Sequence, residues 1–80
     1  MTVRVRLFAG LAEAAKADEI AIDWEGGSAG ELLERVARAR PELARRLAHC
    51  RVAVDCAFVD AGDLVEPAGE IALIPPVSGG

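Results

Sequence analysis

The chain has 80 residues, of which 52% are hydrophobic, and a net charge of −4. This length suits one globular domain that buries about 60 to 65% of its unfolded surface, and the hydrophobic fraction excludes a disordered chain. The negative charge argues against non-specific nucleic-acid binding, which needs a basic surface. No apolar run approaches the roughly 20 residues needed to cross a bilayer, and residues 1–6 lack a signal-peptide pattern. We therefore expect a cytoplasmic protein without membrane contact.

The N-terminal part of the chain predicts two strands and a short helix. Residues 2–9 alternate apolar and polar side chains, as in a strand with one buried face. Phe8 breaks the alternation, so we expect the end of this strand to be covered on both sides. Residues 10–17 are alanine-rich and suit a short helix, and residues 19–24 alternate again as a second strand.

A longer, main helix is predicted to begin at Ser28. The order Ser28-Ala29-Gly30-Glu31 is a capping-box pattern, in which each of the two outer side chains accepts a hydrogen bond from the other residue's backbone N–H. Two preceding glycines invite a phosphate-binding interpretation, but the P-loop ending and the dinucleotide fingerprint are both absent. Pro41 ends or kinks this helix and opens a shorter one that runs to about Ala48.

The remainder of the chain predicts three more strands. A tight turn separates residues 51–54 from residues 57–59, and the apolar run 71–74 predicts a buried last strand. We expect Leu64 and Val65 to pack back onto the core. One amphipathic helix on one face of a mixed sheet of about five strands accounts for every buried stripe, which is an α+β architecture.

Groups for ordinary catalysis or metal binding are scarce. His49 is the single histidine, so a catalytic triad would have to use it; its place at a helix-to-strand junction is more typical of a surface or capping role. Cys50 and Cys56 are too few for a disulfide framework and are expected to be free thiols. With His49 they would supply at most three ligands, without the paired spacing of a zinc site. We therefore expect no metal site and no self-contained enzyme.

Six of the nine basic residues lie in one short segment. They are Arg35, Arg38, Arg40, Arg45, Arg46 and Arg51. A solvated helix face is the plainer interpretation, and a docking patch for a protein partner is the alternative. Nucleic acid comes third, because the segment has no aromatic residue for stacking.

The last six residues form the most distinctive segment. They are Pro75, Pro76, Val77, Ser78, Gly79 and Gly80. The prolines remove two consecutive backbone donors, so sheet pairing cannot continue, and they stiffen the segment, which lowers the entropy lost on entering a partner's groove. A terminal glycine can enter a narrow channel because it has no side chain. We interpret residues 1–74 as the domain, residues 75–80 as an extended tail of roughly 20 Å, and the Gly80 carboxylate as the working group.

This ending resembles that of the small subunit of molybdopterin synthase, a family of ubiquitin-like sulfur carriers with the β-grasp fold. Residues 71–80 match the family's signature ending nearly residue for residue. Weaker matches are the opening strand through Ala9 and residues 31–33, 40–43 and 52–54, in the expected order.

The resemblance implies chemistry at Gly80. An E1-like adenylyltransferase uses ATP to adenylate its carboxylate, and a sulfur donor displaces AMP to leave a thiocarboxylate, 1-thioglycine. The tail then enters the large synthase subunit, where the sulfur is transferred to the pterin precursor of the molybdenum cofactor. In this scheme residues 75–78 dock the tail, Gly79 keeps the channel passable, and the catalytic side chains belong to the large subunit. The resemblance thus implies a hetero-oligomer without a permanently bound cofactor.

Three positions depart from the family's usual pattern: Gly10, Asp55 and Ala68. They affect the expected partner contacts and leave the tail untouched. Three alternatives stay open. The chain could serve thiazole synthesis or tRNA thiolation, it could be a protein modifier conjugated through Gly80 to lysines, or it could be a β-grasp interaction module with an inert tail. The Pro-Pro-Val-Ser approach and the chain length favour the pterin pathway.

Overall fold

The computed structural model describes residues 1–76, so the predictions made for Val77, Ser78, Gly79 and Gly80 lie outside the described residues. Its elements in chain order are β1 (Thr2–Leu7), α1 (Ala9–Ala15), β2 (Glu19–Asp23), β3 (Gly27–Ser28), α2 (Ala29–Ala39), the 3-10 turn η1 (Pro41–Leu43), α3 (Ala44–Leu47), β4 (Arg51–Val54), β5 (Ala57–Val59), β6 (Leu64–Val65) and β7 (Ile71–Ile74).

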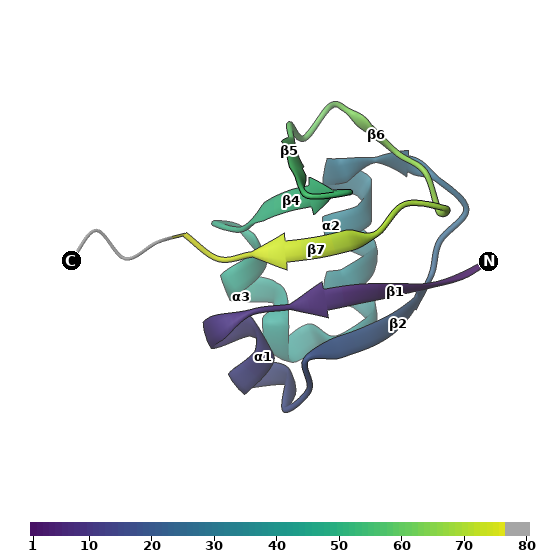
Figure 1. Ribbon diagram of the computed structural model, residues 1–80. Helices are drawn as coiled ribbons and strands as arrows, with labels where there is room; N and C mark the ends of the chain where they lie inside the picture. The colour runs from purple at the N-terminus through teal and green to yellow at the C-terminus, as the bar shows by residue number, and fades with distance from the viewer. Residues whose placement is uncertain (77–80) are drawn as a thin grey trace.

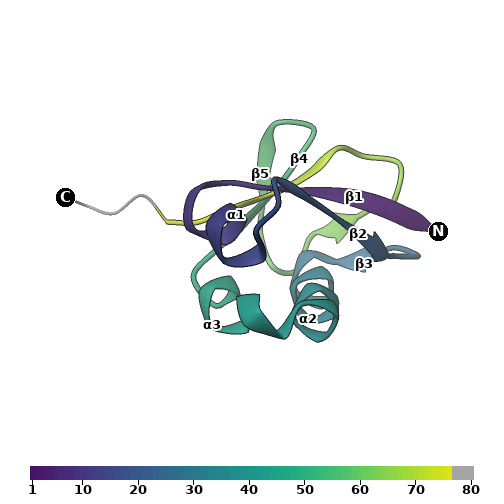
Figure 2. The same ribbon diagram turned by 90° about the horizontal axis from the view of Figure 1, so that it is seen from below.

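Five strands form one mixed sheet in the order β2-β1-β7-β4-β5. The central strand β7 runs parallel to its neighbour β1, and every other neighbouring pair in this sheet is antiparallel. The helices α2 and α3 cover one face of the sheet, as Figure 2 shows from below. The predicted α+β fold, a β-grasp sheet of five strands with a main helix on one face, is therefore confirmed.

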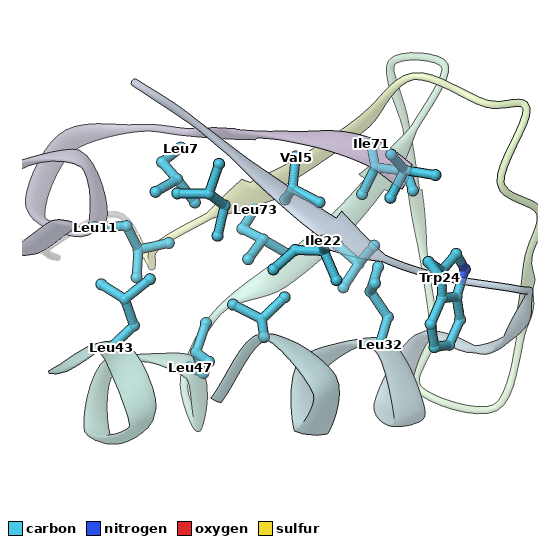
Figure 3. Packing of buried hydrophobic residues seen from close by; sticks show 14 of the residues in the cluster. Val5, Leu7, Leu11, Ile22, Trp24, Leu32, Leu43, Leu47, Ile71 and Leu73 are labelled. Carbon is cyan, nitrogen blue, oxygen red and sulfur yellow. The ribbon is translucent and has the colours of Figure 1, made fainter. Parts of the chain in front are cut away.

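The core lies between this sheet and the helices. In β1 the apolar residues Val3, Val5 and Leu7 are buried while the residues between them are exposed, as the alternation predicts. From the helix side, the fully buried side chains of Leu32 and Leu43 face the sheet (Figure 3). Burial of side chains of this size supplies most of the stabilisation in so small a domain.

The capping box predicted at the start of α2 is present. The Ser28 hydroxyl oxygen accepts from the backbone N–H of Glu31 at 3.1 Å, and the Glu31 carboxylate accepts from the backbone N–H of Ser28 at 2.9 Å. The hydrogen bond from the Ser28 backbone N–H and, to a smaller extent, the Ser28 side chain lower the pKa of Glu31. Pro41 ends the helix as expected and opens the turn η1, which continues into α3.

Two burial predictions are wrong. Phe8 is not covered on both sides: β1 ends at Leu7, and Phe8 becomes the N-cap of α1 with 42% of its surface exposed. Leu64 does not pack on the core, because it lies in a two-residue strand, β6, that pairs with β3 and was not predicted. Neighbouring residues on a strand point to opposite faces, so Val65 is buried while Leu64 is 79% exposed.

Candidate functional site

The tail begins at the end of the central strand β7. This strand is held on both sides, by β1 through the pair Leu7 and Leu73 and by β4 through Val52 and Leu73. Both Ile71 and Leu73 are fully buried. A strand paired on two edges and anchored in the core resists fraying, so the base of the tail has a defined position. Figure 1 shows β7 leaving the sheet at the end where α1 and α3 lie.

Strand pairing stops where the prolines begin. The last paired residue of β7 is Ile74, which lies opposite Arg51 of β4. Pro75 is half-buried and Pro76 is exposed, and neither belongs to a strand. The prediction that the sheet cannot continue into the prolines is confirmed, and its reason is the missing backbone donor. The predicted boundary between domain and tail at residues 74 and 75 stays a prediction.

A hollow of about 600 Å³ lies at the base of the tail. It is lined by Phe8, Ala9, Gly10, Leu11, Arg46, His49, Ile74, Pro75 and Pro76. Its lining is apolar apart from the side chains of Arg46 and His49. The hollow lies between α1, the end of α3 and the end of β7, which are far apart in the sequence. The core side chains Leu11 and Leu43 meet beneath α1 (Figure 3). We call this feature the tail-base hollow.

The guanidinium of Arg46 reaches from α3 across α1. One of its terminal nitrogens lies 3.4 Å from the position that a Cβ atom would take at Gly10. The glycine thus leaves the space in which the Arg46 side chain lies, and a cation is held at the rim of the tail-base hollow. This arrangement depends on tertiary packing and was not predicted.

A second apolar feature lies on the sheet face that points away from α2. The strand register places Phe58, Ala53 and Ala72 side by side on this face. The Phe58 ring is 54% exposed, and the guanidinium of Arg51 lies 4.3 Å from its centroid. Sequence reasoning missed this surface, although the period-two rule applied to β5 would have placed Phe58 opposite the buried face.

The other candidate groups have structural explanations. His49 is exposed at the junction after α3, in agreement with a surface role. The Cys50 thiol donates to the backbone carbonyl of Arg46 at 3.0 Å, and burial raises its pKa, so it is a poor nucleophile. Cys56 is exposed in the β4–β5 turn.

Residues 1–76 hold no cluster of three or more histidine, cysteine or acidic side chains that could bind a metal ion. In the same part of the chain, no helix combines the length and the apolar composition required to cross a membrane.

Comparison with protein-family models matches residues 5–80 to the ThiS family. The chain belongs to the ThiS family. Among solved structures, this ThiS-family chain is similar to SAMP1 from Haloferax volcanii, with 29% identity, a TM-score of 0.81 and complete coverage of both chains. It is also similar to a chain in the complex of subunits 1 and 2 of molybdopterin-converting factor from Helicobacter pylori, with 26% identity, a TM-score of 0.68 and complete coverage of both.

A third similar structure supports the fold alone. It is a putative molybdopterin converting factor subunit 1 from Pyrococcus furiosus, with 22% identity and a TM-score of 0.78 over 96% of this chain and 99% of that one. Among curated proteins no sequence matches. Together these similarities show that this ThiS-family chain is a β-grasp protein of the ubiquitin-like sulfur-carrier type.

Proposed function

We propose that this ThiS-family protein carries sulfur on the C-terminal carboxylate of Gly80. The observation that carries the proposal is the place where the tail starts: Pro75 follows a strand that is paired on both edges and anchored in the core. A fixed base followed by two prolines suits a segment that must reach into a partner's active site. The catalytic side chains are then the partner's.

The proposed chemistry proceeds in two steps at the carboxyl group of Gly80. A carboxylate oxygen of Gly80 attacks the α-phosphorus of ATP, which is bound by an E1-like activating enzyme; pyrophosphate leaves and a glycyl-adenylate forms. Hydrosulfide, or an equivalent sulfide-level nucleophile, then attacks the carbonyl carbon; AMP leaves, the sulfur loses its proton, and a thiocarboxylate remains. Glycine suits both steps because no side chain crowds the carboxyl group, either as the nucleophile or as the group attacked. ATP is consumed on the activating enzyme, and we propose no permanently bound cofactor on the carrier.

We further propose that the sulfur goes to the pterin precursor of the molybdenum cofactor, in the large subunit of molybdopterin synthase. The ending of residues 71–80 and the similarity to a chain of the two-subunit molybdopterin-converting factor complex support this destination. The tail-base hollow supplies apolar surface at the base of the tail, and the exposed Phe58 supplies more on the sheet face, as a stable hetero-oligomer requires. In this complex Pro75, Pro76, Val77, Ser78 and Gly79 contact the large subunit.

A second function is favoured by a separate observation. The similar chain from Haloferax volcanii, at 27% identity over 95% of this chain, is called small archaeal modifier protein 1. A protein modifier uses the same activated Gly80, but a lysine amine attacks the carbonyl in place of the sulfur nucleophile. The two functions therefore differ in the acceptor and share the activation step.

Intact-mass measurement tests the proposal. The protein is incubated with ATP, an activating enzyme and a sulfur source, and the expected product has one oxygen at the C-terminus replaced by sulfur. An unchanged mass, with an activating enzyme that modifies its own carrier in parallel, would refute sulfur carriage. The matched control has one alanine appended after Gly80, which leaves residues 1–76 intact and is expected to abolish the product.

A second assay distinguishes the destinations. The thiocarboxylated protein is mixed with the large subunit and the pterin precursor, and formation of molybdopterin supports the pterin pathway. Conjugates on lysines of other proteins, without molybdopterin, would instead show a modifier. If the variant with the appended alanine retained full activity in the cell, the protein would be an interaction module with an inert tail.

A further inference from the structure

Three exposed basic or titratable side chains form a ridge on α3 and the turn after it. We call Arg45, Arg46 and His49 the basic ridge. The buried neighbours Leu43 and Leu47 anchor this segment in the core, so the ridge has a fixed position on the surface. The backbone carbonyl of Arg46 also accepts from the Cys50 thiol at 3.0 Å, which ties the end of α3 to the next strand.

Arg45 and Arg46 share with Arg35, Arg38 and Arg51 the lack of a carboxylate oxygen within 4.0 Å in residues 1–76. Arg4, Arg6 and Arg40, in contrast, each have a carboxylate oxygen within 4.0 Å. The ridge therefore presents positive charge that the described part of the chain does not neutralise, on a protein whose net charge is −4.

The ridge also lies between two concave surfaces. On one side is the tail-base hollow of about 600 Å³, to whose lining Arg46 and His49 belong. On the other side Arg45, Arg46 and His49 line a second hollow of about 560 Å³ with Pro41 and Glu42. A ligand on the ridge can thus place an apolar group in the first hollow and negative groups along the ridge itself.

We propose that the basic ridge binds an acidic segment of a partner protein, whose carboxylates contact Arg45 and Arg46 while one of its apolar side chains occupies the tail-base hollow. Charge complementarity favours this occupant, because the free positive charge adjoins an apolar cavity. The consequence is orientation: a partner that binds the ridge lies beside Pro76 and receives the tail. Electrostatic attraction also raises the rate of encounter.

Two other occupants fit less well. The chain's own residues 77–80 could fold back, but ordering four residues, two of them glycine, costs more free energy than one valine side chain and one exposed ion pair return. A nucleic acid would meet a ridge of only three side chains without an aromatic platform for stacking, on an acidic protein. Both remain outcomes of the test.

Binding of a synthetic peptide tests the proposal without any enzyme. The probe is a short peptide with one phenylalanine flanked by aspartates and glutamates, titrated into the full chain and followed by NMR. We expect signals of Phe8, Leu11 and Arg46 to shift, with an affinity that falls at least several-fold as salt is raised. Equal binding of a lysine-flanked peptide, or tighter binding of an RNA oligonucleotide, would overturn the proposal. NMR contacts between residues 77–80 and the residues of the hollow, observed in the free protein, would show that the tail occupies the hollow instead.

Matched charge reversals identify the surface. The double variant Arg45→Glu with Arg46→Glu is expected to weaken peptide binding about tenfold or more at low salt. The control, Arg35→Glu with Arg38→Glu, makes the same change of charge at a separate hollow on α2 and is expected to bind as the parent does. Equal loss in both variants would refute a defined ridge and indicate net charge alone.

One further variant leaves the ridge residues in place. Gly10→Asp puts a carboxylate next to the Arg46 guanidinium, since a Cβ atom there would lie 3.4 Å from it. An acid in the first turn of α1 is favourable for the helix, so this variant should fold. We expect it to weaken peptide binding; undiminished binding would contradict the role of Arg46. Because no step needs Gly80, the sulfur-carrier proposal and this one can fail independently.

Discussion

Replacing Leu73 by alanine tests how much the burial of the central strand, from which the tail starts, contributes to the stability of the domain. Leu73 is fully buried between β1, β4 and the helices, and truncation of such a leucine costs about 2–5 kcal/mol from lost burial and the cavity left behind. A domain of this length has roughly 4–12 kcal/mol of stability at about 0.05–0.15 kcal/mol per residue. The variant therefore loses a large part of its free energy of unfolding.

The matched control is the same substitution at Leu64, which is 79% exposed. Its expected cost is within about 0.5 kcal/mol, as for ordinary surface substitutions. Thermal unfolding followed by circular dichroism measures both, and at about 4–8 °C per kcal/mol Leu73→Ala is expected to lower Tm by at least roughly 8 °C while Leu64→Ala changes it little. Similar shifts for the two variants would refute the assignment of burial on which the site rests.

Other predictions concern the cap, pH and a tight turn. Ser28→Ala removes the N-cap acceptor of α2 and is expected to cost about 1 kcal/mol in urea unfolding; no change would mean that the cap is replaced by water. Because the folded state lowers the pKa of Glu31, its contribution is present above the ordinary glutamate range and is lost as pH falls through the folded pKa. Glu31→Gln should therefore flatten the acid limb of the stability profile, and an unaltered limb would argue against this linkage. Gly69→Ala places a Cβ atom 2.8 Å from a methyl carbon of Val54 and is expected to lower the free energy of unfolding by about 1–3 kcal/mol. An unchanged melting curve would mean that the valine side chain moves aside without cost.

Local patterns predicted the elements because each depends on neighbours in the chain. The alternation in residues 2–7 places Val5 on the core side whatever lies beyond it, and the capping box joins two residues only three positions apart. Phe8 and Leu64 were misplaced for the opposite reason. Their exposure depends on where β1 ends and on the pairing of β6 with β3, a contact between distant segments.

Some features of the candidate site likewise depend on local sequence, and others depend on contacts between distant segments. The amino-acid sequence by itself determined the strand of residues 71–74, the prolines that stop its pairing, and the tail that ends in Gly80, because missing donors and missing side chains are properties of the residues themselves. Only the tertiary structure decided that β7 is central, that α1 and α3 enclose a hollow at the base of the tail, and that Arg46 lies across Gly10. These features join residues that are far apart along the chain, such as Gly10 and Arg46 or Phe8 and Ile74, and such contacts form only when the core packs.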